Sequence, residues 1–426
     1  MLVTRQTLLF IPFLLFATWF LLAHKSTILP TGFRYAASIP ILDEASLAGP
    51  ASSTLGFGGI LAVSGKGSPR RSKLEQMANV TGLDITIPDM PEWTEEDIAN
   101  FTKALAYDGR ETGRGSKLSW LSHNHVLEWF LASDLETALI IEDDVDWDIH
   151  LRNVQVPAAA AAARTLFQPA TTYWGNDSAW DVMYLGHCGD WFGRLQAGIG
   201  EGHQFPENLT SRHHVTFTDP TMPANDSLHP MTAKFMTALQ RPEHTRALHA
   251  SAFPLCTFGY AVTKASAKRI VEVVAPITRP EHMAFDMMMT TGCNARGLKC
   301  YTLNPEIFHH MPGDSLIKMQ ENKTQVALPP VDAAGLDQTQ ERNETSNIGC
   351  GFWSGAFDFD DDKTRLAMLQ EEVGRKGRCL KPGREEKIDT YSVENRIGEE
   401  LVQAVAAGEI SAGKVNVELA RGNGPS

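Results

Sequence analysis

Short apolar runs alternate with amphipathic stretches from about residue 58 to residue 312. A continuous apolar run bounded by polar residues is typical of a buried strand, whereas apolar residues three and four positions apart indicate a helix with one buried face. Their alternation predicts an α/β fold with a mostly parallel central sheet and right-handed crossovers. The predicted strands are 59–63, 84–87, 138–141, 181–185, 257–263 and 300–303, and the predicted helices are 73–80, 92–106, 116–132 and 266–274.

Other stretches lack this alternation and suggest boundaries around and within the domain. Long loops without periodicity are usually functional or disordered. We therefore expect a stalk at 24–57, a long loop or insertion at 190–252 within the 58–312 domain, a flexible linker at 313–348, and an irregular, partly disordered C-terminal extension at 349–426.

The N-terminus carries an apolar segment at residues 7–23, flanked by Arg5 and by His24-Lys25. This segment reaches the lower limit for a membrane-spanning helix and exceeds the apolar core of a usual cleaved signal. We expect an uncleaved signal-anchor with residues 1–6 as a cytosolic tail, which makes the chain a single-pass type II membrane protein. A cleaved signal, giving a secreted form, is the alternative.

Seven N-x-[ST] triplets indicate that the domain enters a secretory lumen, where such asparagines accept glycans on surface loops. They begin at Asn79, Asn100, Asn176, Asn208, Asn225, Asn322 and Asn343. The six cysteines all follow the apolar segment and form no C-x-x-C pair, which favours disulfides over a zinc site. Fifteen pairings are possible, with Cys350–Cys379 the simplest local one. A net charge of −13 argues against a nucleic-acid partner.

The most informative motif is the stretch ALIIEDDVDWD at 138–148, in which an apolar run leads directly into five acids. Ligands of open α/β sheets bind just beyond the carboxyl ends of such strands. Crowded carboxylates repel one another, and a hard divalent cation removes that repulsion while holding the oxygens of a diphosphate. The alternative is an acidic turn that caps the next helix. The acids are Glu142, Asp143, Asp144, Asp146 and Asp148.

In the order of its motifs the chain resembles glycosyltransferase family 25, the lipooligosaccharide-type and collagen-type sugar transferases, in a fungal-like version. The resemblance covers about residues 58–310. It departs from the family where Lys66 to Pro69 replace an expected Asp, and neither 190–252 nor the region after 313 has a counterpart. The matching stretches are VSGKGSPRRSKLEQMANVTGLDI, GSKLSWLSHNHVLEWF, ALIIEDDV, DVMYLG and TFGYAVTKASAKRI, together with the region of Asp286.

This resemblance implies a Rossmann-like, glycosyltransferase-A type fold that transfers a sugar, with inversion, from a nucleotide-diphosphate donor to a glycan or protein hydroxyl. UDP-galactose is the first candidate donor, Mn²⁺ or Mg²⁺ the expected cofactor, and the Golgi or endoplasmic reticulum membrane the expected location. Metal ligation falls to Asp144 and Glu142, with Asp146 as the alternative, and catalysis to Asp144 and to Asp286 as base. Nucleotide-sugar binding falls to Arg70, Arg71, Ser122, His123, Glu142 and Asp143.

Each of these residues also has a structural interpretation. The arginines could form a solvated turn, the Ser-His pair could simply pack within its helix, and Asp286 could cap a helix. His309 and His310 follow the last predicted strand and could complete a metal shell, or could be surface residues. Asp148 lies farther along the acidic run, and we expect its replacement to be neutral.

Two other functional classes fit the same sequence. One is a non-catalytic lumenal carbohydrate-binding or scaffold protein on the same fold. The other is a metal-dependent lumenal hydrolase. The hydrolase would bind metal without nucleotide, whereas the scaffold would bind neither.

Overall fold

The computed structural model describes residues 49–106, 112–190, 209, 212–282, 284–311 and 344–382. The chain divides into two compact units, 1–41 and 42–426, and all the described residues belong to the second. Within these residues no helix is long and apolar enough to cross a membrane. The predicted cytosolic tail, signal-anchor and most of the stalk lie outside the described residues, as does most of the predicted linker.

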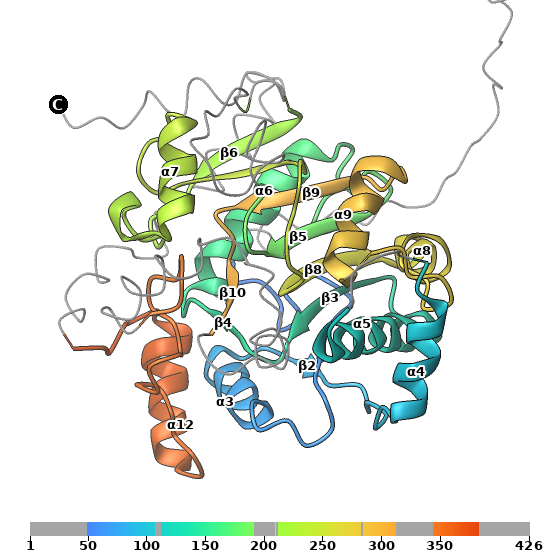
Figure 1. Cartoon of the computed structure of the whole chain (residues 1–426). Coiled ribbons are helices and arrows are strands. Elements are labelled where there is room, and N and C mark those ends of the chain that lie inside the picture. Colours follow the sequence, from blue (N-terminus) through green and yellow to red (C-terminus); the bar gives the residue numbers. More distant parts are fainter. Residues whose placement is uncertain are drawn as a thin grey trace, which may run out of the picture. The chain divides into compact units, whose positions relative to one another are not determined.

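A mixed sheet of ten strands forms the centre of the second unit (Figure 1). Eight of them follow one another in the order β2-β1-β3-β8-β5-β9-β7-β6, while β10 pairs with β5 and β4. Their bounds are β1 Gly59–Val63, β2 Ile85–Thr86, β3 Thr137–Glu142, β4 Val145–Trp147, β5 Val182–Gly186, β6 His214–Thr218, β7 Thr245–Ala250, β8 Gly259–Thr263, β9 Cys300–Asn304 and β10 Phe308–His310.

Most strands of this sheet share one direction. The pairs β1–β2, β1–β3 and β5–β9 are parallel, whereas β8 runs antiparallel to both β3 and β5. Likewise β7 runs antiparallel to both β9 and β6. Only β8 and β7 therefore point against the other strands of the main path, and the prediction of a mostly parallel α/β sheet is confirmed at this level.

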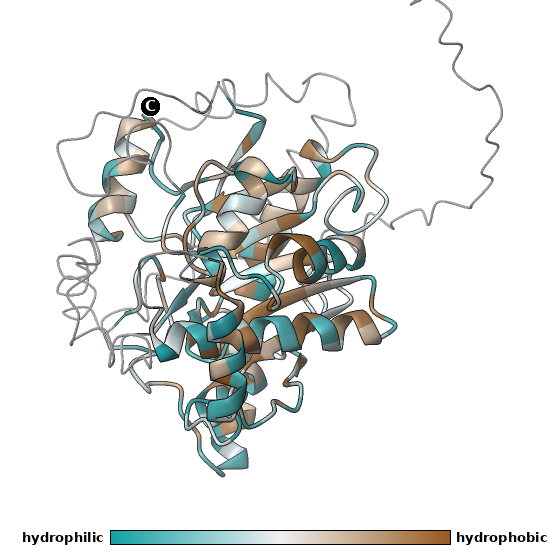
Figure 2. Cartoon of the chain, turned by 45° about the vertical axis from the view of Figure 1, so that its right-hand side comes forward, coloured by the Kyte–Doolittle hydropathy of each residue, from teal (hydrophilic) through white to brown (hydrophobic). Residues whose placement is uncertain are grey.

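Helices cover both faces of the sheet, and alternate strand residues enter two separate hydrophobic clusters. In β3, Leu139 and Ile141 join one cluster while Ala138 and Ile140 join the other. Burial on both faces explains why this strand is a continuous apolar run in the sequence. Figure 2 shows apolar colours along the strands and polar colours on the outer surfaces of the helices. The helices are α3 Arg71–Thr81, α4 Glu95–Ala104, α5 Arg114–Ala132, α6 Val156–Leu166, α7 Pro230–Ala238, α8 Lys264–Arg269, α9 Phe285–Ala295 and α12 Lys363–Leu369.

The segment 190–252 is not the simple long loop that its composition predicts. Its part from 212 onward forms β6, α7 and β7, which extend the sheet beyond β9 and bury a third, smaller hydrophobic cluster. The strands HVTFT and TRALHA contain His, Thr and Arg at buried positions, so the apolar signal is weak although the backbone is well paired. Residues 191–208 lie outside the described part.

The structure describes residues 344–382, which comprise the end of the predicted linker and the first part of the predicted C-terminal extension and are here called the C-terminal clasp. It contains α12 and the π-helical turn η6 (Gln370–Arg375), which both contact α3 (Figure 1). Disulfides join Cys188 to Cys256, Cys293 to Cys300, and Cys350 to Cys379. The predicted disulfide bonding is thereby confirmed, including the local pair within the clasp.

Candidate functional site

The acidic motif lies where the carboxyl ends of two parallel strands meet. Val63 at the end of β1 pairs with Glu142 at the end of β3, so the residues that follow both strands share one edge. Ser64 Oγ donates a hydrogen bond of 2.6 Å to Asp143 Oδ2 across this edge. Ser64 was not among the residues predicted from sequence, although its position directly after a predicted strand was a usable signal.

Two arginines at the start of α3 complete this edge, as their position after the first strand predicts. Arg70 Nη1 donates to Asp144 Oδ2 at 2.6 Å and to Asp143 Oδ1 at 3.3 Å. Arg71 donates from Nε and Nη2 to the hydroxyl and carbonyl oxygens of Ser64, each at 2.9 Å. The structure therefore brings both arginines and two acids of the motif into one polar cluster, here called the acidic edge (Ser64, Arg70, Arg71, Asp143 and Asp144).

Asp144 has the most unusual environment of this cluster. Burial and the neighbouring Glu142 carboxylate raise its pKa to about 7, against the opposing effect of Arg70. Its Oδ1 atom is buried and has no hydrogen-bond partner among the described residues. A buried acceptor without a partner costs free energy, so this oxygen would gain from a proton or a bound cation.

A second group of side chains surrounds Glu142. His123 on α5 is 1% exposed and has its Nε2 atom 3.4 Å from Glu142 Oε1 and its Nδ1 atom 3.1 Å from the Tyr260 hydroxyl. The imidazole stacks on Phe285 with ring centroids 4.8 Å apart. Thr257 Oγ1 also donates to Glu142 Oε1, at 3.2 Å. Thr257 and Tyr260 are contacts that the sequence analysis missed.

Asp286 lies in the first turn of α9, close to this second group. Its oxygens accept hydrogen bonds from the backbone N–H groups of Cys256 at 3.1 Å and Met287 at 2.8 Å. Burial raises the pKa of Asp286, and Glu142 adds to the rise while His123 opposes it. Because Cys256 is disulfide-bonded to Cys188, the loop that holds Asp286 is linked covalently to the chain just after β5.

Ser122 and His123 are neighbours in sequence but contact different surroundings. Ser122 Oγ accepts a hydrogen bond of 3.1 Å from Trp93 Nε1, which joins α5 to the segment before α4. Only His123 reaches the residues at the carboxyl end of β3. Within the predicted Ser-His pair, the structure thus assigns a packing contact to Ser122 and the site contact to His123.

Asp146 and Asp148 are turned away from the acidic edge and hold the C-terminal clasp. Asp146, which is fully buried, accepts hydrogen bonds from Thr345 Oγ1 at 2.6 Å, Phe352 N at 2.8 Å and Trp353 N at 3.2 Å. Burial raises its pKa, and these bonds oppose the rise. The oxygens of Asp146 are therefore occupied by the clasp, which leaves Asp144 and Glu142 as the better candidates for metal ligation.

Asp148 is also fully buried, contrary to the expectation of a replaceable outer acid. It accepts from Cys350 N at 2.7 Å and lies 2.6 Å from His150 Nδ1. Burial raises the pKa of Asp148, but the charge and hydrogen bonds of His150 outweigh that effect and lower it overall. We now expect its replacement to destabilise the fold rather than to be neutral, because a buried, bonded carboxylate is costly to change.

His309 and His310 lie on β10, beside the backbone of the acidic motif. His309 pairs with Asp146 and His310 with Val145 in the antiparallel register of β10 and β4, and Met311 N donates to Asp144 O at 2.7 Å. His309 Nδ1 lies 2.6 Å from Glu306 Oε1. Burial raises the pKa of Glu306, but the hydrogen bond and charge of His309 outweigh that effect and lower it to about 2.

The residues present fit a divalent cation that is shared with a ligand. Among the described residues, no group of three or more His, Cys, Asp and Glu is arranged to enclose a metal ion by itself. Mg²⁺ sites at phosphates commonly use one or two carboxylates and take their remaining ligands from phosphate and water. The unpaired Oδ1 of Asp144, with Glu142 nearby, is a donor set of that kind.

The described sequons lie at or near the surface, but not all lie in loops. Asn79 and Asn100 are exposed on α3 and α4, whereas Asn176 lies in a turn and Asn225 begins the short helix η4 (Asn225–Ser227). The expectation of loop positions is therefore wrong for two of them. Asn208, Asn322 and Asn343 lie outside the described residues.

Comparison of the chain with protein-family models finds no match, and comparison with curated proteins finds no significant relative.

Proposed function

We propose that this chain is a metal-assisted glycosyltransferase that moves a sugar from a nucleotide-diphosphate donor to a hydroxyl group. One observation carries the proposal. Arg70, Asp143 and Asp144 meet at the joined carboxyl ends of β1 and β3, and Asp144 keeps one buried oxygen without a partner. Arginine side chains at such an edge can bind phosphates, and carboxylates beside them can bind a cation, so the edge suits a ligand that brings both phosphates and a cation.

The roles proposed for the individual residues follow from their positions. Asp144 and Glu142 would hold Mn²⁺ or Mg²⁺, which when bound supplies positive charge to the departing diphosphate. Arg70 and Arg71 would bind phosphate oxygens through their planar guanidinium groups. Asp143 is held by Ser64 and Arg70, so its role is to orient Arg70 beside Asp144.

Asp286 is the proposed base. Transfer forms a bond between the acceptor oxygen and the sugar's anomeric carbon as the bond from that carbon to the diphosphate oxygen breaks. The electron pair leaves with the diphosphate, and the acceptor's proton passes to the base. A carboxylate whose pKa is raised by burial is better suited to take that proton than one at its ordinary value.

The proposed setting is the lumen of the Golgi or endoplasmic reticulum, with a glycan or glycoprotein as acceptor and the membrane as the partner of residues 7–23. A secreted form would follow if the signal were cleaved. The three disulfides support an oxidising compartment, because disulfides persist there and are rare in the cytosol.

The test is nucleotide binding with Asp144→Asn as the variant. Calorimetric titration with UDP, GDP and CMP, with and without Mn²⁺, should show one nucleotide that binds in a Mn²⁺-dependent manner. Asp144→Asn keeps the volume and removes the charge, so we expect about a 10²-fold or greater loss of sugar transfer and weakened Mn²⁺-dependent binding.

Asp134→Asn is the matched control, because Asp134 is exposed in the turn before β3, at the opposite end of the same strand. It should bind and transfer as the unchanged protein does. Metal binding without nucleotide would favour a hydrolase instead, and the absence of both would favour a carbohydrate-binding or scaffold protein. Equal activity of both variants would remove the metal site from this motif.

A further inference from the structure

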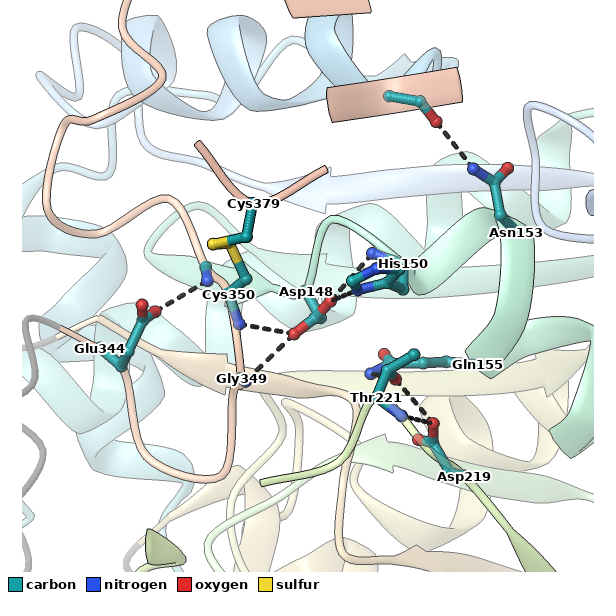
Figure 3. A network of polar contacts seen from close by, with 12 residues as sticks. Asp148, His150, Asn153, Gln155, Asp219, Thr221, Glu344, Gly349, Cys350 and Cys379 are labelled. Carbon is teal, nitrogen blue, oxygen red and sulfur yellow. Dashed lines mark hydrogen bonds and ion pairs between the residues drawn. A yellow bond between two sulfur atoms is a disulfide. The ribbon is translucent and has the colours of Figure 1, made fainter. Parts of the chain in front are cut away.

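The C-terminal clasp is fastened to the acidic motif through backbone N–H groups. The Asp146 carboxylate accepts hydrogen bonds from the N–H groups of Phe352 and Trp353. The Asp148 carboxylate accepts hydrogen bonds from the N–H groups of Gly349 and Cys350 (Figure 3). A methyl group on Gly351 would collide with the Asp146 carboxylate. The close approach of the clasp backbone to Asp146 therefore depends on glycine. The clasp is attached at Asp146 and Asp148, which follow Asp144 by two and four positions in the sequence.

The clasp is also closed on itself at both ends. The Cys350–Cys379 disulfide joins its beginning to its end (Figure 3). Beside the disulfide, Lys381 Nζ lies 2.7 Å from Glu344 Oε1, with the two side chains 7% and 0% exposed. Glu344 Oε2 in turn accepts from Gly351 N at 2.8 Å. Buried and hydrogen-bonded in this way, the pair fixes one arrangement of the segment.

The far side of the clasp braces α3. Lys73 forms an ion pair with Asp358, and Gln76 Oε1 accepts from Phe359 N at 3.1 Å. Gln370 Nε2 donates to Asn79 O at 3.0 Å near the end of the helix. The contacts thus extend along α3, whose N-terminal residues Arg70 and Arg71 reach the acidic edge.

We propose that the C-terminal clasp is a positioning element for the acidic edge, with the Cys350–Cys379 disulfide as its lock. It holds the edge from two sides: through β4 it fixes the chain that carries Asp143 and Asp144, and through α3 it fixes Arg70 and Arg71. Asp146 and Asp148 are positioning residues that act through the clasp. The identity of the ligand bound at the acidic edge rests on the proposed function. The coupling between the clasp and the acidic edge does not depend on it.

The experiment removes the Cys350–Cys379 disulfide from the full chain and measures the backbone hydrogen exchange of the acidic edge in the absence of any ligand. Hydrogen exchange of peptides covering residues 64–74 and 140–148 should be faster in Cys350→Ser/Cys379→Ser and in Gly351→Ala than in the unchanged protein. The controls are Cys293→Ser/Cys300→Ser, which removes a disulfide between α9 and β9, and Gly113→Ala, where the added methyl meets nothing within 4 Å. The controls should leave both peptides unchanged.

A second measurement separates this inference from the proposed function. Loss of supporting contacts around metal ligands typically costs about 10–100-fold in metal affinity, so Mn²⁺-dependent UDP affinity should fall by about tenfold in the two clasp variants and stay within about twofold in the controls. If the unchanged protein binds no nucleotide, the proposed function fails while the exchange result still decides the clasp. Unchanged exchange at both peptides in the folded Cys350→Ser/Cys379→Ser variant would overturn the inference.

Discussion

The carboxylates between Glu142 and Asp148 differ in what surrounds them rather than in chemistry. Asp146 and Asp148 are fully buried and receive several hydrogen bonds each, whereas Asp144 keeps a buried oxygen without a partner in the described structure. A satisfied buried carboxylate stabilises one fold, while an unsatisfied one has capacity for a ligand. At the scale of single residues, hydrogen-bond satisfaction separates the structural acids from the candidate ligands.

Arg246 shows how much such satisfaction contributes to stability. It is 1% exposed, donates to Asp219 Oδ2 at 2.6 Å, and also donates to the carbonyl oxygens of Pro305 and Glu306. Arg246→Leu leaves Asp219 buried without its counter-charge, which should lower the free energy of unfolding by about 3–5 kcal/mol. Urea denaturation at neutral pH measures this.

The comparison for Arg246→Leu is Lys268→Ala. Lys268 lies 3.9 Å from Glu272 in an exposed pair on one helical surface. Exposed pairs of this kind contribute about 0.3–0.5 kcal/mol, so the variant should be nearly as stable as the unchanged protein. A loss below about 1 kcal/mol in Arg246→Leu would show that the buried pair is far less important than its burial implies.

At the scale of elements, most of the strands that sequence predicts are buried on both faces by their own apolar residues. The run GILAV became β1 as predicted, and TALIIE, VMYLG and CYTLN became β3, β5 and β9 with boundaries shifted by about one residue. β6 and β7 escaped prediction because they bury His, Thr and Arg side chains, of which Arg246 and His249 have hydrogen-bond partners elsewhere in the chain. Such partners leave no mark on local periodicity.

One of those polar residues makes β7 sensitive to acid. His249 is completely buried, and burial lowers its pKa from 6.5 to about 4. Between about pH 6.5 and pH 4, His249 is protonated in the unfolded chain but neutral in the folded chain. The free energy of unfolding therefore decreases as the pH falls through this range. The shift corresponds to at most about 3 kcal/mol.

His249→Gln should flatten this part of the stability profile. Glutamine does not titrate and keeps an acceptor for the Asn304 amide, which lies 3.1 Å from His249 Nε2. Chemical denaturation between pH 7 and 5 checks the slope, a range above the one in which Glu306, with its pKa of about 2, loses its own contribution. An unchanged slope in the variant would assign the acid sensitivity to other groups.

At the scale of the whole molecule, the acidic edge was predictable and its support was not. Parallel strands that end in polar residues must bring those residues together, so Arg70, Arg71 and the acids of the motif could be placed from sequence alone. Asp146 and Phe352 are 206 positions apart, and no local pattern links them. The glycosyltransferase resemblance itself stays a prediction until nucleotide binding is measured.

The clasp also covers apolar surface, which leads to a prediction for truncated chains. Phe352 packs against Trp147 with ring centroids 6.1 Å apart and against Phe357 at 5.3 Å, and Trp147 is fully buried. A chain ending at residue 343 uncovers Trp147 together with the Asp146 and Asp148 carboxylates. It should aggregate, whereas a chain ending at residue 382 keeps the clasp and should elute free of aggregates in size-exclusion chromatography. A well-behaved shorter chain of unchanged melting temperature would contradict this account.

The order of the disulfides has a consequence for biosynthesis. Cys188 pairs with Cys256, Cys293 with Cys300, and Cys350 with Cys379, so each described disulfide joins cysteines that are consecutive in the chain. A polypeptide that enters an oxidising compartment from its N-terminus can therefore close each bond as soon as the second partner arrives. In such a compartment, pairing in the order of synthesis would give the native connectivity without passing through crossed disulfides.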